Sequence, residues 1–219
     1  MNVNDPSWDH ILASLKENQN LSRVQAIWAM AQILDGATDN ETIKSFLLAL
    51  KAKGETADEV SALVEAMYQK AQLIDIPDRA VDIVGTGGDG ANTINISTAA
   101  AFVAAGAGAK VVKHGNKSVT SLSGSSDVLS ALGIKIDQSI EQSTKNLNEL
   151  GICFLWANFH HPIMKHWSQV RSELGIRSIF NLVGPLCNPA NVRRQIVGVY
   201  HQKWMNSVAQ VLKSLGSEF

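Results

Sequence analysis

A glycine-rich turn that directly follows a short apolar strand places the strongest constraint on the fold of this chain. Val81-Asp82-Ile83-Val84 is predicted to be the strand, Gly85-Thr86-Gly87-Gly88-Asp89-Gly90 is the turn, and a helix is predicted over residues 97–107. Glycines let the backbone adopt positive φ and approach a ligand closely. Turn amides and the start of the next helix can then donate to phosphate oxygens. The sequence therefore predicts a site for a phosphorylated ligand on this turn.

Strand-like and helix-like segments alternate through the rest of the chain after Pro77. Further strands are predicted near residues 110–112, 134–136, 152–156 and 195–200, and helices near 126–132, 139–150, 161–174, 177–183 and 204–215. Such alternation is typical of a mainly parallel sheet with helices on its faces. We therefore expect an α/β domain over residues 76–219.

Residues 1–75 are predicted to be entirely helical. A first helix is expected over residues 7–16, and three further helices begin with a capping box, in which two side chains cap the first turn reciprocally. The paired residues are Ser22 with Gln25, Thr38 with Glu41, and Thr56 with Glu59. Gly36 and Gly54 stand where helices should end. We interpret this part as a small helical bundle that packs against or pairs with another surface.

Charge and composition argue against two classes of partner. Lys plus Arg number 19 and Asp plus Glu number 20, so the net charge of −1 lacks the basic excess of a nucleic-acid binder. Residues 1–10 lack an apolar signal core, and the apolar stretch 99–109 is too short to span a bilayer, so we expect a cytoplasmic protein. Cys153 is expected to be a buried thiol, Cys187 is expected in a partly exposed loop, and no disulfide between them is expected.

The glycine turn also matches the fingerprint of dinucleotide-binding proteins, Gly-x-Gly-x-x-Gly. A dinucleotide site needs an acidic residue about 20 positions further on, at the end of the second strand. Here that strand ends in Lys113-His114, and a cation suits a second phosphate better than a ribose diol. A Walker loop is excluded, because no Gly-Lys-Ser/Thr follows at the required spacing. A glycine turn without any ligand remains an alternative.

Two polar segments accompany the turn. Asn95-Ile96-Ser97-Thr98 opens the predicted helix, where hydroxyls and amides can bind phosphate or hydrated Mg²⁺, or simply cap the helix. Residues 113–121 form a polar loop at the end of the next strand, which is where ligands bind in parallel sheets. His160, His161 and His166 lack the spacing of a zinc site, so the residues alone leave a capping or packing role for His161.

These segments, taken together and in order, resemble the anthranilate phosphoribosyltransferases, a family of tryptophan-biosynthesis enzymes. The resemblance runs essentially the whole length of the chain. It is carried by Lys51-Ala52-Lys53-Gly54-Glu55-Thr56, Gly85-Thr86-Gly87-Gly88-Asp89, Asn95-Ile96-Ser97-Thr98, Lys113-His114-Gly115-Asn116, Ser123-Gly124-Ser125-Ser126-Asp127, His161-Pro162-Ile163-Met164-Lys165, Val170-Arg171, Leu174-Gly175-Ile176-Arg177 and Phe180-Asn181-Leu182-Val183-Gly184-Pro185-Leu186-Cys187-Asn188-Pro189-Ala190.

The resemblance implies a fold, a reaction and partners. The helical domain of residues 1–75 would form a homodimer, and helices at about 161–185 would return to it. Residues 76–219 would form an incomplete α/β domain of the nucleoside phosphorylase and phosphoribosyltransferase type. The enzyme would transfer the phosphoribosyl group of phosphoribosyl diphosphate (PRPP) to anthranilate, giving N-(5-phosphoribosyl)anthranilate and diphosphate, with Mg²⁺ as cofactor.

The resemblance also assigns roles to individual residues. Lys113, Asp89 and Arg171 would be catalytic, Ser97 would bind Mg²⁺, and Gly85, Asn116 and Arg171 would face anthranilate. His114, His161 and Pro185 would line the same entry channel. The residues expected against PRPP are Gly85, Gly88, Asp89, Thr93, Asn95, Ile96, Ser97, Thr98, Lys113, His114, Gly115, Asn116, Lys117, Ser118, Val119, Thr120, Ser121 and Ser125.

The sequence departs from the family in length and at a few positions. Family members continue beyond residue 219 with a segment that carries an Asp-Glu pair for Mg²⁺, so we expect little transferase activity from these 219 residues alone. Trp156-Ala157-Asn158 replaces the usual Phe-Ala and frequent proline, and Lys117 replaces a common arginine. Rival interpretations are a nucleoside phosphorylase, a nucleic-acid-binding relative without catalysis, and a dimerisation scaffold.

Overall fold

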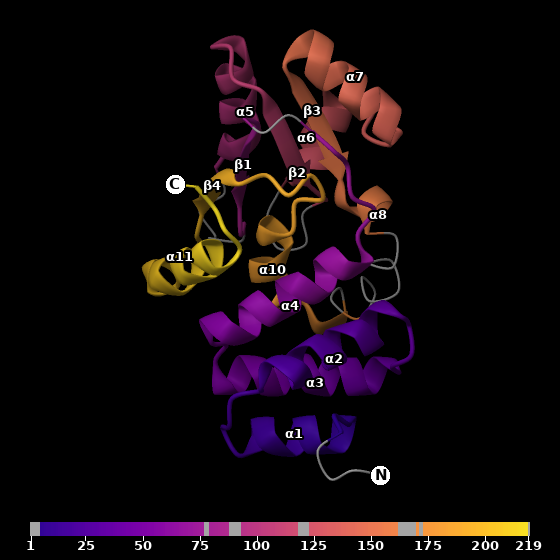
Figure 1. The fold of residues 1–219 in the computed structure, drawn as a ribbon, viewed down its shortest axis with the longest axis vertical. Helices are drawn as coiled ribbons and strands as arrows, with labels where there is room; N and C mark the ends of the chain where they lie inside the picture. Colours follow the sequence, from indigo (N-terminus) through magenta and orange to yellow (C-terminus); the bar gives the residue numbers. More distant parts are fainter. Residues whose placement is uncertain are drawn as a thin grey trace.

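The computed structural model describes residues 5–76, 79–87, 93–117, 123–161, 170 and 173–218. Figure 1 shows a bundle of helices from the amino-terminal part of the chain, with a sheet and its helices stacked beyond it. This arrangement confirms the predicted class, a small helical domain followed by a mainly parallel α/β domain.

Among the described residues, four helices form the bundle: α1 (Trp8–Lys16), α2 (Arg23–Leu34), α3 (Asn40–Lys53) and α4 (Ala57–Lys70). The capping boxes predicted at Ser22 and Thr56 are both present. The predicted cap at Thr38 is wrong, because Asp39 caps α3 with its carboxylate, which accepts from the Thr42 amide at 2.9 Å. The hydroxyl of Thr38 instead accepts a hydrogen bond from the indole of Trp8 at 3.2 Å. Aspartate is also the stronger N-cap of the two residue types.

In the described part of the chain, the sheet contains four parallel strands in the order β3-β2-β1-β4. They are β1 (Val81–Gly85), β2 (Val111–Gly115), β3 (Ile152–Trp156) and β4 (Arg194–Gly198). The predicted strand at 134–136 is wrong, because the Ile134 amide donates to the Leu129 carbonyl and closes the end of a helix instead. Lys113 and His114 were expected in a loop but lie within β2, which continues to Gly115.

Helices connect the strands and cover the sheet. They are α5 (Ile96–Gly106), α6 (Ser125–Ala131), α7 (Ile140–Leu150), α8 (Ala157–His160), α10 (Phe180–Leu186) and α11 (Met205–Ser214), with a short 3₁₀ helix over Gln202–Trp204. Figure 1 shows α8, which directly follows β3, on the side of the sheet nearest the bundle. The carboxyl ends of these parallel strands share one edge, so that edge faces the helical domain. Within the described residues, no helix is both long and apolar enough to cross a membrane.

The two parts share a hydrophobic core. Val183 and Leu186 of α10 and Val208 and Val211 of α11 belong to the same buried cluster as the bundle helices. The Tyr68 hydroxyl of α4 donates to the Leu186 carbonyl at 3.2 Å, and Figure 1 shows α10 between the sheet and α4. This core also buries Cys187, so its expected partial exposure is wrong, while Cys153 is buried as predicted and both thiols are free.

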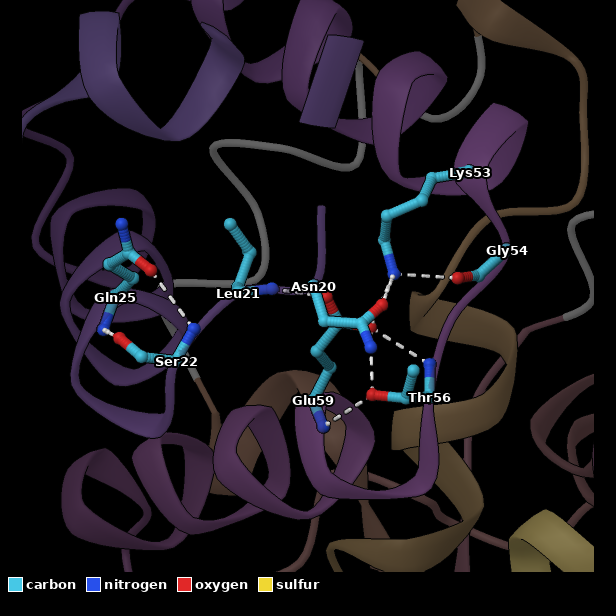
Figure 2. A network of polar contacts seen from close by, with 8 residues as sticks. All are labelled: Asn20, Leu21, Ser22, Gln25, Lys53, Gly54, Thr56 and Glu59. Atoms are coloured by element: carbon cyan, nitrogen blue, oxygen red, sulfur yellow. Dashed lines mark hydrogen bonds and ion pairs between the residues drawn. The ribbon is translucent and has the colours of Figure 1, made fainter. Parts of the chain in front are cut away.

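A buried ion pair joins three bundle segments at the start of α4 (Figure 2). The Lys53 Nζ atom lies 2.8 Å from Oε2 of Glu59, and the two side chains are only 3% and 0% exposed. The Glu59 carboxylate also accepts from the Leu21 amide and the Thr56 amide, each at 2.8 Å. The Lys53 ammonium also donates to the Asn20 side chain and the Gly54 carbonyl. Every charged atom of the pair is therefore hydrogen-bonded.

Candidate functional site

The glycine turn begins at the carboxyl end of β1 and is held against the end of β4. The Thr86 amide donates to the Gly198 carbonyl at 2.9 Å, and the Thr86 hydroxyl accepts from the Tyr200 amide at 3.0 Å. Gly87 has φ of +57°, a conformation that side chains rarely adopt. The predicted site residues Gly88 and Asp89 lie outside the described residues.

Arg177 fixes the orientation of this turn, a role that the sequence did not indicate. Its guanidinium donates to the carbonyls of Gly87 and, at 3.2 Å, Thr86. It also lies 3.5 Å above the centre of the Tyr200 ring. In a trans peptide the C=O and the following N–H point in opposite directions, so the Gly87 amide is turned away from Arg177. No local pattern connects an arginine to a turn 90 residues earlier.

The polar start of α5 is organised by Asn95. Its side-chain oxygen accepts from the Thr98 amide at 3.0 Å and the Ser97 hydroxyl at 3.1 Å, and its amide group donates to the Ser123 carbonyl. Asn95 is therefore a helix cap that also ties α5 to the segment before α6. Thr93 and Ile96 are exposed, whereas Thr98 is buried.

Lys113 is buried beneath the sheet edge and points toward α5. Its ammonium donates to the Ile83 carbonyl at 2.6 Å and to the Ser97 hydroxyl at 3.3 Å. Burial lowers the pKa of Lys113, and the nearby Asp82 carboxylate opposes that shift. The structure thus brings together Ser97 of α5 and Lys113 of β2, which lie 16 residues apart in the sequence.

Asp82 lies fully buried on β1, next to Lys113. Its carboxylate accepts from the Asn188 amide group at 2.9 Å and from the His114 backbone amide at 3.3 Å. Burial raises the pKa of Asp82 to about 6, although Lys113 and these hydrogen bonds work in the opposite direction. Asp82 and Lys113 therefore form a polar layer under the predicted ligand site.

The end of β2 approaches two neighbours very closely. A Cβ added at Gly115 would lie 2.8 Å from the Ser125 side chain, so only glycine fits there. The next residue, Asn116, hydrogen-bonds to the side chains of Trp156 and Asn158. Lys117 is exposed, and Ser118, Val119, Thr120 and Ser121 lie outside the described residues.

Three histidines are buried between the sheet and the helical domain. The rings of His114 and His161 lie 5.7 Å apart, and His161 Nε2 donates to the Cys187 carbonyl at 3.2 Å. His160 Nδ1 donates to the Gln72 carbonyl at 2.9 Å. Burial lowers the pKa of His161 to about 4, so its imidazole is neutral at pH 7. Pro185 is buried in α10, while Arg171 and His166 fall outside the described residues.

A cavity of about 340 Å³ adjoins the turn through Arg177. Lys51 and Glu55 line it from the end of α3 and the loop that follows, and Tyr200, Lys203 and Trp204 line it from the segment after β4. Burial raises the pKa of the Glu55 carboxyl group. The sequence did not predict this cavity, since its walls come from distant segments.

The fold and the strand-end site together define a two-domain protein with an α/β domain suited to a phosphorylated ligand. Residues 9–71 match the helical bundle domain of the glycosyl transferase family, and residues 77–219 match the α/β domain of the same family. The chain therefore belongs to this glycosyl transferase family.

The individual relatives of this chain share one name, anthranilate phosphoribosyltransferase. Anthranilate phosphoribosyltransferase of Afipia carboxidovorans is 46% identical over 94% of this chain, which spans 61% of that protein. The crystal structure of the Thermus thermophilus enzyme of that name superimposes with a TM-score of 0.88 and 38% identity, covering 94% of this chain and 63% of the other. The Saccharomyces cerevisiae enzyme in complex with PRPP and Mg has a TM-score of 0.85 and 34% identity, and the match covers 97% of this chain and 65% of the yeast chain. The chain thus spans about three fifths of the length of these relatives.

Proposed function

We propose that the protein to which these residues belong transfers the phosphoribosyl group of PRPP to anthranilate, in the biosynthesis of tryptophan. The observation that carries the proposal is the contact of Lys113 with the Ser97 hydroxyl and with the Ile83 carbonyl, on the strand that leads into the glycine turn. The yeast relative binds PRPP and Mg in one structure and 4-fluoroanthranilate in another, which supports the same pair of substrates here.

The chemistry needs stabilisation of a leaving group more than a strong base. The bond from C1 of the ribose to the diphosphate oxygen breaks, the amine nitrogen of anthranilate bonds to C1, and that nitrogen then loses a proton. Negative charge collects on the departing diphosphate. The Lys113 ammonium is held rigidly by the Ile83 carbonyl and the Ser97 hydroxyl, and a preorganised cation of this kind stabilises such charge. The turn amides would contribute in the same way.

The described residues fit a magnesium ion that arrives with the diphosphate. They contain no group of three or more His, Cys, Asp or Glu side chains that could hold a metal. Mg²⁺ commonly takes substrate phosphates and water as most of its ligands, so the Ser97 hydroxyl would be the protein ligand in this part of the chain. When bound, the ion would neutralise charge on the diphosphate.

Anthranilate would bind on the side of β2 and β3 that faces the helical domain. Asn116 and Gly85 both lie at that edge, at the ends of their strands. We assign carboxylate recognition to Arg171, because a guanidinium pairs with a carboxylate through two parallel hydrogen bonds. His114 and His161 would form a neutral wall of the entry channel.

Calorimetry tests the proposal directly. PRPP with Mg²⁺ should bind the chain, and NAD and single-stranded DNA should not. Lys113→Met should weaken PRPP binding by about 10- to 100-fold, since a hydrogen bond to a charged group contributes about 1.5–3 kcal/mol. Lys145→Met removes an exposed lysine of α7 and serves as the matched control. Absence of PRPP binding by the protein that contains these residues, in the presence of Mg²⁺, would exclude the proposal.

We also propose a cytoplasmic homodimer formed through the helical domain. Val24 of α2 and Leu48 of α3 leave apolar side chains exposed on the bundle, as an interface would require. Sedimentation equilibrium should give twice the chain mass of 23.6 kDa. A monomer at all concentrations up to 100-fold above the assay range would contradict the dimer.

A further inference from the structure

Asn116 lies where three segments of the α/β domain meet. It directly follows Gly115, the last residue of β2, which pairs in register with Trp156, the last residue of β3. Asn158 follows two residues later on α8. Neighbouring strand ends thus place two polar side chains beside the Asn116 carboxamide.

The hydrogen bonds of Asn116 fix which way its carboxamide faces. Its oxygen accepts from the Lys117 backbone amide at 2.8 Å and from the Trp156 indole at 3.2 Å. Both of these partners can only donate. If the carboxamide rotated by 180°, its NH₂ group would therefore face the N–H groups of Lys117 and Trp156 and could not bond to them. Its nitrogen donates to the Asn158 side-chain oxygen at 3.1 Å. The orientation is therefore determined by the chemistry of the neighbours.

Counting donors and acceptors shows what remains for a ligand. A carboxamide has two N–H donors and an oxygen with two lone pairs. The oxygen has two partners, and one N–H is bound to Asn158. Within the described part of the chain the second N–H has no partner. Asn116 can therefore offer a ligand a donor and not an acceptor.

We propose that Trp156 and Asn158 are positioning residues that hold Asn116 so that its remaining N–H faces an acceptor oxygen of the aromatic substrate. This inference rests on the proposed function, in which Asn116 faces anthranilate, whose carboxylate is such an acceptor.

The test compares two single variants with a matched control. Trp156→Phe removes the indole N–H but keeps an aromatic ring, and Asn158→Ala removes the acceptor. Each should weaken anthranilate binding about 5- to 10-fold in calorimetry and leave the Kd for PRPP within twofold. Trp8→Phe deletes an equivalent indole hydrogen bond, 3.2 Å to Thr38 in the helical bundle, and should leave both Kd values unchanged. The unfolding midpoint of each variant establishes that it is folded.

Selectivity distinguishes positioning from a general structural effect. The uncharged analogue 2-aminobenzamide carries its own N–H donors, so the fixed donor of Asn116 should discriminate against it. In Trp156→Phe the Asn116 oxygen loses one of the two donors that fix its orientation, so the carboxamide can turn over and accept from that analogue. The ratio of the analogue's Kd to that of anthranilate should therefore fall at least threefold in Trp156→Phe. It should stay unchanged in Asn158→Ala, where both donors remain. Unchanged anthranilate affinity in both variants, or an unchanged ratio in Trp156→Phe, overturns the inference. Failure of the protein that contains these residues to bind PRPP would instead reject the proposed function.

Discussion

Replacing Glu59 with alanine should lower the free energy of unfolding by about 3–5 kcal/mol, the usual cost of removing one partner of a buried ion pair. The variant leaves the Lys53 ammonium buried without its counter-ion, 3% exposed. It also removes the acceptor for the Leu21 and Thr56 amides. A loss of this size is a large part of the total stability of a typical domain, about 5–15 kcal/mol.

Urea denaturation followed by circular dichroism measures the effect. Glu65→Ala is the matched control, because Glu65 is on the same helix but pairs with Arg23 at the surface. Surface pairs contribute about 0–1 kcal/mol. The double variant Lys53→Met/Glu59→Met should recover much of the loss, since it leaves no unpaired charge. A loss below about 1 kcal/mol for Glu59→Ala would show that the network contributes little.

Acidification from pH 6.5 to about 4 should destabilise the folded state through the buried histidines. Burial lowers the pKa of His161 to about 4, and burial also lowers the pKa of His114 and His160. Between the folded and unfolded pKa values the unfolded chain binds protons that the folded chain does not, so stability falls as pH falls. For His161 alone the full shift corresponds to at most about 3 kcal/mol.

Asp82 acts in the opposite direction. Burial raises its pKa from 3.8 to about 6, so the folded state binds the extra proton and gains stability as pH falls from 6 toward 4. Glu55 acts in the same sense as Asp82, because burial raises its pKa as well. Three histidines therefore oppose two carboxyl groups, and the net slope should be positive, with stability rising as pH rises.

Denaturation curves at pH 4.5, 5.5 and 7 test this balance. His161→Asn should flatten the pH dependence, Asp82→Asn should steepen it, and His10→Asn, on the exposed side of α1, should leave it unchanged. An equal slope in the unaltered protein and His161→Asn would mean that another group controls the acid response.

The sequence predicted the parts of this structure that depend on neighbouring residues. The caps at Ser22 and Thr56, the strand that ends at Gly85 and the helix that follows Asn95 arise from signals within a few positions. A capping role for Asn95 was also predicted, as the alternative to ligand binding, because Asn95 stands at the start of a predicted helix. The placement of Lys113 beside Ser97 could be anticipated only as a shared sheet edge, without the contact itself.

Only the tertiary structure decided which distant groups meet. Three features join segments that are far apart in the sequence. They are the burial of Cys187, the hydrogen bond from Arg177 to the Gly87 carbonyl, and the hydrogen bonds of the Asn116 side chain. The hydrogen bond from the Trp8 indole to Thr38 is a further contact of this kind. Local patterns determine which element forms, because hydrogen bonds and periodicity act over a few residues. Packing determines the partners, because burial depends on what the whole chain brings to one place.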